Sequence, residues 1–157
     1  MTETTHAPAS TSDMVREFHT TFQVPTAPGA KPVARFERLE LRYSLVAEEF
    51  AELTEAVYGA EAGAQVRAAT ARVVAEGDDT GADVVEILDA LADLVVVEHG
   101  WAIEAHLPLE EALVEVHRTN MAKLGPDGLP ILRAGDNKIL KPAGWTPPDL
   151  AGVIARA

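Results

Sequence analysis

The sequence predicts an all-α protein: an antiparallel bundle of four to five helices with a C-terminal extension that contains a short β-hairpin. Three observations indicate this class. Apolar residues recur at helical spacing as far as about residue 123, and glycines and prolines separate the periodic segments. From Gly125 onward the pattern changes to short apolar runs between turn residues, and we find no internal repeat.

Composition narrows the possible functions. The chain has 157 residues, 47% of them hydrophobic, and no cysteine, which excludes disulfides and thiolate metal ligands. Its formal net charge of −12 argues against binding to nucleic acid or to anionic membranes, because both require a basic face. No apolar run can span a bilayer and the N-terminus does not resemble a secretory signal, so we expect a cytoplasmic protein.

The expected elements follow from hydrophobic periodicity and from the glycines and prolines that interrupt it. Residues 1–11 are rich in Thr, Ala, Pro and Ser and are predicted to be a disordered tail, whereas 12–157 should form a single domain. The expected helices cover about residues 12–23, 33–58, 64–75, 82–105, 109–123 and 149–155. The predicted hairpin pairs residues 131–133 with 138–140 around the turn Gly135-Asp136-Asn137.

The second of these helices carries two rows of interest. One row steps by four and three, as in a seam that packs on another helix: Leu39, Tyr43, Val46, Phe50, Leu53 and Val57. The other row begins with Leu41 and Leu45 and continues to Glu49, with Glu52 one turn further and Glu48 beside them. This helix should therefore direct carboxylates towards the interior of the bundle.

The helix expected over 82–105 carries acids in an apolar setting. In Val84–Val97 every residue is Val, Ile, Leu or Ala except Glu86, Asp89 and Asp93. Helical spacing places these three within about 60° of each other. A helix that is apolar nearly all round is normally buried, and buried carboxylates must be paired, protonated or bound to metal. Arginines from neighbouring helices are the alternative to a metal.

If the two acidic faces meet, four or more carboxylates converge and repel one another. Ligand sets made only of oxygen select hard divalent cations, so Mg²⁺ or Mn²⁺ is the expected counter-ion. Such an ion orients phosphates and lowers the pKa of an attacking water. Each motif alone is typical of a solvated helix face, whereas their combination on two apolar helices is more specific.

Glu48-Glu49-x-x-Glu52, followed by an acid pair on an apolar helix, resembles the all-α nucleoside triphosphate pyrophosphohydrolases. These include MazG-like proteins, dimeric dUTPases and phosphoribosyl-ATP pyrophosphohydrolase. Asp89-Ala-Leu-Ala-Asp93 before a valine run, and the sequence His-Arg-Thr-Asn-Met-Ala-Lys-Leu-Gly-Pro-Asp-Gly over 117–128, are similar to the MazG-like, dUTPase-related branch. The resemblance covers about residues 13–149.

The resemblance implies metal-dependent cleavage between the α and β phosphates of a nucleoside triphosphate, with dUTP or a non-standard nucleotide among the candidates. The products would be a nucleoside monophosphate and pyrophosphate. It implies that Glu49 and Glu52 bind Mg²⁺ or Mn²⁺. Glu48 would bind a further metal or activate water, so Glu48 and Glu49 are the candidate catalytic residues.

The second acidic motif departs from the family pattern. The family's Glu-x-x-Asp usually ends just before the apolar run, which puts Ala90 in the glutamate position if Asp93 is the aspartate. Glu86 and Asp89 restore the pattern one turn earlier, and both registers remain open. We favour Asp89 and Asp93 as direct ligands, with Glu86 as a ligand or as support for one.

Other residues are candidates for binding the substrate. Asn120 and Lys123 match family positions near the nucleotide and its phosphates. Arg118 is a phosphate ligand or the partner of a bundle acid, and Trp145 is a candidate for contact with the base or with a partner subunit. Two lysines of the predicted hairpin are further candidates for phosphate contact, Lys138 and Lys141.

Two alternatives compete with this interpretation. One keeps the fold but makes phosphoribosyl-ATP the substrate. The other is a non-catalytic helical interaction protein whose acids pair with arginines. The Leu39–Val57 seam and the resemblance both indicate a homodimer with a cleft lined by both chains, and tetramers occur among relatives.

Overall fold

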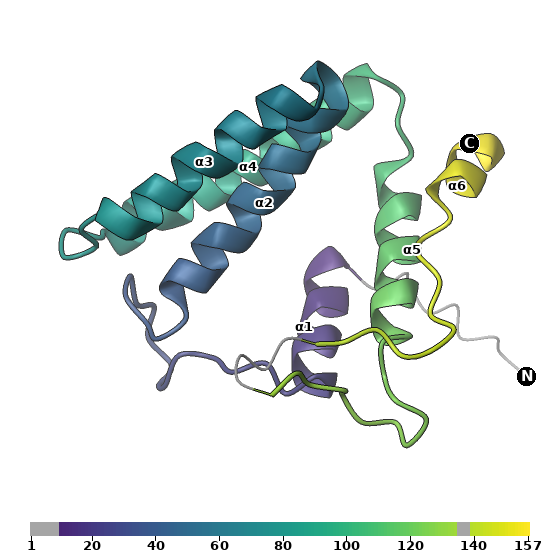
Figure 1. The fold of residues 1–157 in the computed structure, drawn as a ribbon, viewed down its shortest axis with the longest axis horizontal. Coiled ribbons are helices and arrows are strands. Elements are labelled where there is room, and N and C mark those ends of the chain that lie inside the picture. The colour runs from purple at the N-terminus through teal and green to yellow at the C-terminus, as the bar shows by residue number, and fades with distance from the viewer. Residues whose placement is uncertain (1–9, 135–138) are drawn as a thin grey trace, which may run out of the picture. The chain divides into compact units, whose positions relative to one another are not determined.

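The computed structural model describes residues 10–134 and 139–157. In this part of the chain it contains six helices: α1 (Thr11–Thr21), α2 (Leu39–Tyr58), α3 (Ala60–Glu76), α4 (Val84–Glu104), α5 (Leu109–Met121) and α6 (Leu150–Arg156) (Figure 1). The predicted all-α class is confirmed. None of these helices is long and apolar enough to cross a membrane.

The predicted β-hairpin is not seen as a two-stranded ribbon in the described residues. The described residues of this segment form an isolated antiparallel bridge between Leu132 and Ile139. A 2.7 Å hydrogen bond also runs from the Leu140 N–H to the Ile131 carbonyl. A two-stranded ribbon this short is marginal without a third strand or a helix packed on it. The proposed turn and Lys138 fall in 135–138 and lie outside the described residues, as does 1–9 of the predicted tail.

The chain divides into two compact units. One comprises the described residues of Met1–Thr26 together with Leu94–Ala157, and the other comprises Ala27–Asp93. The boundary falls within α4, which runs as one continuous helix from the second unit into the first. All the predicted metal ligands belong to the unit Ala27–Asp93, and all the predicted substrate ligands belong to the other unit.

The unit Ala27–Asp93 contains a tight hairpin of α2 and α3, which lie side by side (Figure 1). The helices meet at Gly59, whose φ of +92° suits glycine. At Gly63 the backbones nearly touch, because an added Cβ would lie 2.8 Å from the Cβ of Glu55 and 3.0 Å from the Ala51 carbonyl oxygen. An ion pair of 2.7 Å between Arg67 and Glu55 joins the two helices. The helix break expected over 59–63 is therefore a turn at Gly59 alone.

The start of α2 is six residues later than predicted, at Leu39 instead of Val33. Its N-cap is Arg38, which makes no capping hydrogen bond through its side chain, and the Leu39 N–H closes a turn onto the Phe36 carbonyl. No Ser, Thr, Asp or Asn precedes the apolar row to mark its beginning, so the sequence specifies this end weakly.

The other unit packs α5 against α1 and α6. Helix α1 begins with a capping box, in which Ser10 Oγ accepts from the Asp13 N–H and the Asp13 carboxylate accepts from the Ser10 N–H. His117 Nε2 on α5 lies 2.9 Å from a carboxylate oxygen of Glu17 on α1. Asp149 caps α6 by accepting from the Gly152 N–H at 2.9 Å.

Candidate functional site

The acids of the first motif lie together on α2. Partial burial raises the pKa of Glu49, and the neighbouring charges of Glu52 and Glu48 raise it further. Every charged neighbour that acts on this carboxylate therefore opposes its ionisation. A cation bound beside Glu49 would relieve this repulsion, and carboxylate oxygens are the ligands that hard divalent cations prefer.

The acids of the second motif lie on α4, and here the structure corrects an expectation. Glu86, Asp89, Asp93 and Glu52 are exposed in the single chain, and Glu49, although partly desolvated, is also accessible to solvent. The prediction that both acidic faces are buried within one chain is therefore wrong. The apolar residues around the α4 acids are also open to solvent, for example Val85 and Leu88, each 68% exposed. The sequence pattern showed that most residues of α4 are apolar, but it does not show which other surface packs against this helix.

The single chain does not gather these acids into a metal site. Among the residues that the structure describes, no group of three or more His, Asp or Glu side chains is placed to hold an ion. The assignment of Glu49 and Glu52 with the α4 acids as metal ligands, and of Glu48 as a water-activating base, therefore stays a prediction.

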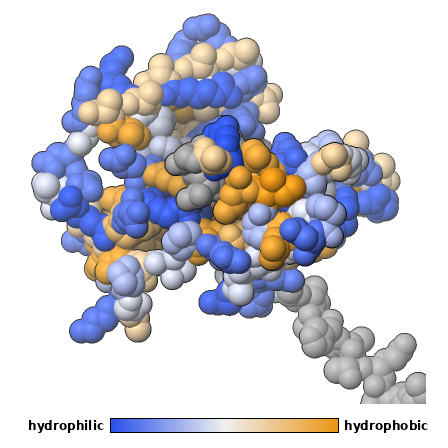
Figure 2. All heavy atoms as spheres, turned by 60° about the horizontal axis from the view of Figure 1, so that its bottom comes forward, coloured by the Kyte–Doolittle hydropathy of each residue, from blue (hydrophilic) through white to orange (hydrophobic). Residues whose placement is uncertain are grey.

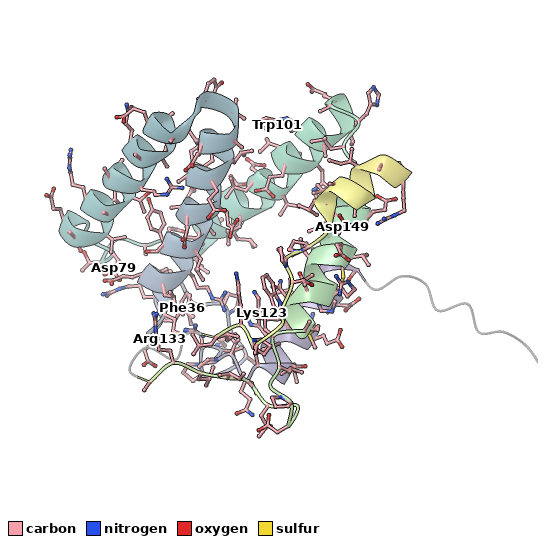
Figure 3. All side chains as sticks on the ribbon, turned by 45° about the vertical axis from the view of Figure 1, so that its right-hand side comes forward. Phe36, Asp79, Trp101, Lys123, Arg133 and Asp149 are labelled. Atoms are coloured by element: carbon pink, nitrogen blue, oxygen red, sulfur yellow. The ribbon has the colours of Figure 1, made fainter. Side chains whose placement is uncertain are left out.

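The predicted substrate ligand Asn120 lies in the last turn of α5, and Lys123 lies two residues beyond the end of that helix. Figure 3 labels Lys123. Lys123 Nζ donates a 2.7 Å hydrogen bond to Asn120 Oδ1, and both side chains are half-buried. Burial lowers the pKa of Lys123, and the nearby charge of Lys141 lowers it further. These two predicted residues are thus brought together, and the lysine lies in a positively charged environment.

Trp145 fastens the C-terminal segment to α5. Its indole N–H donates to the Thr119 carbonyl at 2.8 Å, and Thr119 is buried. The aromatic ring is therefore fixed in place by the fold. This geometry makes the tryptophan an anchor of the tail, whatever else its ring contacts.

Arg118 adopts the second of its two predicted roles, as the partner of an acid. Its Nε and one terminal nitrogen each donate to the Glu115 carboxylate at 2.7 Å. Glu115 also accepts from the Asp149 N–H at 2.9 Å, at the start of α6. Hydrogen bonds from Arg118 and from Asp149 lower the pKa of Glu115 from its ordinary 4.5 to about 2. Arg118 therefore takes part in holding α6 on α5.

The lowered pKa of Glu115 predicts that the docking of α6 on α5 depends on pH. Because the pKa of Glu115 is lower in the folded chain, its stabilising effect is complete above pH 4.5 and is lost as the pH falls towards about 2. We expect amide hydrogen exchange in α6, measured by mass spectrometry, to accelerate over this window relative to exchange in α3. In Glu115→Gln the α6 amides should exchange rapidly at every pH, and an unchanged pH profile in this variant would contradict the assignment.

Two arginines that were not predicted as site residues lie near the start of α2: Arg38 is its N-cap and Arg42 is in its first turn. Arg38 and Arg42 lie eleven and seven residues before Glu49, which corresponds to about three and two helical turns. Burial, followed by the charge of Arg38, lowers the pKa of Arg42. One terminal nitrogen of Arg38 is buried and has no hydrogen-bond partner in the described chain. The spacing of seven residues between Arg42 and Glu49, about two helical turns, was the signal in the sequence that could have identified Arg42.

Comparisons with known proteins agree on one group. The model of the phosphoribosyl-ATP pyrophosphohydrolase family matches residues 15–120. A crystal structure at 1.78 Å resolution from Exiguobacterium sp. 255-15, of a protein assigned as an NTP pyrophosphohydrolase, is similar with a TM-score of 0.71. It is 31% identical over 94% of this chain and 95% of that one. A search of curated proteins gives no significant match.

Proposed function

The chain belongs to the phosphoribosyl-ATP pyrophosphohydrolase family, among the MazG-like all-α nucleotide pyrophosphohydrolases, and from this premise we propose its reaction. It hydrolyses a nucleoside triphosphate between the α and β phosphates and releases a nucleoside monophosphate and pyrophosphate. The proposed substrate is dUTP or a non-standard nucleotide, whose removal would protect the nucleotide pool. The observation that carries the proposal is the family match over 15–120, which includes all six predicted acids and Asn120.

We propose Mg²⁺ or Mn²⁺ as the cofactor. The donor chemistry fits, because every candidate ligand is a carboxylate. Partial burial, followed by the neighbouring charges of Glu52 and Glu48, raises the pKa of Glu49, and a bound cation would offset both effects. Glu49 and Glu52 would hold the ion together with two or three of Glu86, Asp89 and Asp93. When bound, the ion neutralises phosphate charge and lowers the pKa of water. Glu48 is the proposed acceptor of the proton from the attacking water.

We propose that the protein acts as a homodimer, with a tetramer as the alternative. The seam that should pack on another helix is open in the single chain: Phe50 is 57% exposed and Val46 48% exposed. Figure 2 shows hydrophobic side chains, in orange, exposed to solvent on the face that it presents. Exposed apolar surface of this kind marks a protein interface, and a second copy would cover it and line the cleft with the first.

Phosphoribosyl-ATP is the alternative substrate, because the matching family is named for its hydrolysis. A non-catalytic interaction protein is less well supported. That hypothesis requires arginines to neutralise the acids, which would lower the pKa of Glu49, whereas the pKa of this residue is raised.

A substrate panel tests the proposal. The purified chain would be incubated with dUTP, the four standard deoxynucleotides, non-standard nucleotides and phosphoribosyl-ATP, each with Mg²⁺, Mn²⁺ or EDTA. We expect a nucleoside triphosphate to release pyrophosphate when either Mg²⁺ or Mn²⁺ is present, and no pyrophosphate to be released in EDTA. Preferential turnover of phosphoribosyl-ATP would favour the alternative, and the absence of pyrophosphate from every substrate would reject both enzymatic functions.

A further inference from the structure

Two arginines with like charge are neighbours at the start of α2. Arg38 and Arg42 are four residues apart, which places their side chains one helical turn apart. Burial lowers the pKa of Arg42 and the charge of Arg38 lowers it further, so the two guanidinium groups lie close enough to repel each other. The positive end of the helix dipole also disfavours cations in this position. The two arginines therefore do not stabilise α2, and another role must be sought for them.

Arg38 lacks an acceptor for one of its donors. One terminal nitrogen of its guanidinium group is buried without a hydrogen-bond partner, and the residue takes part in no ion pair within the described part of the chain. A buried donor without an acceptor costs free energy. The residue as a whole is only half-buried, so a ligand can approach the guanidinium group from solvent. A small rotation of this group towards a bound anion would satisfy the donor.

The fold fixes the segment that carries Arg38. Three residues earlier, Arg35 pairs with the Asp79 carboxylate at 2.7 Å, which ties the segment to the loop between α3 and α4. The Leu39 N–H donates to the Phe36 carbonyl at 3.0 Å and closes the turn that leads into α2. The place of Arg38 at the helix start is thus set by its neighbours, and Arg35 already has a carboxylate partner.

The two arginines belong to the same compact unit and the same helix as the acids of the first motif. Arg42 precedes Glu49 by seven residues, which separates the two positions by about 20° around the helix axis and about 10 Å along it. A triphosphate chain together with an extended arginine side chain spans a distance of this size. A nucleotide whose cleaved bond lies beside Glu49 would therefore have its terminal phosphate within reach of the arginines.

We propose that Arg38 and Arg42 bind the terminal phosphate of the nucleotide and thereby make the enzyme prefer triphosphates to diphosphates. A guanidinium group donates in a planar fork that matches two phosphate oxygens. The arginines contact the phosphate farthest from the cleaved bond, so they determine specificity and take no part in proton transfer. The inference rests on the proposed function, because the phosphate is that of its substrate. A carboxylate of a second copy is the competing acceptor, and the test separates the two.

A kinetic test compares the best triphosphate of the substrate panel with the corresponding diphosphate. Arg38→Gln and Arg42→Gln each remove charge-assisted hydrogen bonds, and we expect kcat/KM for the triphosphate to fall about tenfold or more while that for the diphosphate stays nearly unchanged. Arg42→Lys keeps the charge without the fork and should fall between the parent and Arg42→Gln. Arg72→Gln is the matched control, because Arg72 is an exposed arginine on α3 of the same unit. An equal loss on both substrates would overturn the proposal.

Binding of sodium tripolyphosphate to the full chain, measured by isothermal titration calorimetry in EDTA, tests the site without turnover. We expect the Kd of Arg42→Gln to rise about tenfold or more and that of Arg72→Gln to equal that of the parent. If no nucleotide is hydrolysed but Arg42→Gln still weakens binding, the arginine site stands and the proposed reaction does not. If turnover occurs and both variants bind equally, or the parent does not bind, only the arginine site is rejected.

The competing acceptor gives a different result. If the arginines pair with a carboxylate of a second copy, Arg42→Gln should lower the molar mass measured by light scattering and leave the Kd of tripolyphosphate unchanged. That outcome would assign the arginines to an interface between copies and overturn their assignment to the nucleotide.

Discussion

Glu49→Gln should lower the rate of pyrophosphate release by about 100-fold or more while leaving the fold intact. Removal of a group that merely supports a metal ligand already reduces activity or metal affinity by about 10–100-fold, and the loss of a ligand should exceed this. The measurement is kcat/KM for the best substrate of the panel with Mn²⁺ in excess. Glu40→Gln is the matched control, because Glu40 is an exposed glutamate in the first turn of the same helix.

The same substitution should make the metal-free chain slightly more stable at neutral pH. The pKa of Glu49 is raised in the folded state, so folding favours the protonated side chain and is opposed by the carboxylate once the pH exceeds that pKa. Glutamine removes the charge at every pH. The melting temperature of Glu49→Gln in EDTA should therefore be at or above that of the parent at pH 7, and the difference should vanish in acid.

Metal reverses the order of stability. At a Mn²⁺ concentration of about 100 times Kd, linkage stabilises the parent by about 2.7 kcal/mol, which raises Tm by roughly 5–10 °C for a chain of this size. Glu49→Gln should lose most of this increase. Equal Mn²⁺ shifts in the parent and in the variant, together with equal turnover, would show that Glu49 does not bind the ion. A variant that is less stable in EDTA would show that the carboxylate is neutralised by a partner.

The helices were largely predictable because their signals are local. The acid-bearing helix α4 begins two residues later than expected and ends one residue earlier, and α5 begins at Leu109 as predicted after Pro108. The prediction was less accurate where the local signals are weak. No capping residue marks the start of α2, so the helix was expected from Val33 although it begins at Leu39. The alternating segments after Ile131 are too short to form a ladder in the described residues.

The site was less predictable, because it depends on contacts that spacing does not encode. Periodicity placed Glu49 and Glu52 on one helix and Asp89 and Asp93 on another, and the structure agrees with both placements. Whether the two helices meet depends on the surfaces that cover them, and in the single chain both sets of acids are exposed. Lys141 was only one of two hairpin lysines in the sequence, and its place beside Trp145 depends on the turn at Gly144.

A charge in the α2 seam should separate the proposed homodimer into single chains of 16.7 kDa. The seam combines helical spacing from Leu39 to Val57 with exposure of its central residue, Phe50, at 57%. In a dimer Phe50→Asp would lose a buried aromatic contact and bury a carboxylate without a partner. Truncation of a central interface residue alone raises the binding free energy by about 2 kcal/mol or more, which weakens the dimer about 30-fold.

Tyr58→Asp provides the control for this experiment. Tyr58 is on the same helix and is 79% exposed, but it lies outside the seam, so the same change from aromatic to acid should leave the dimer intact. The association is measured as molar mass by light scattering over a range of protein concentrations.

If both chains line the cleft, turnover by Phe50→Asp should fall with dilution as the dimer dissociates. A parent chain that remains a monomer at micromolar concentration would contradict the dimer, and turnover proportional to chain concentration in that monomer would place the complete site within one chain.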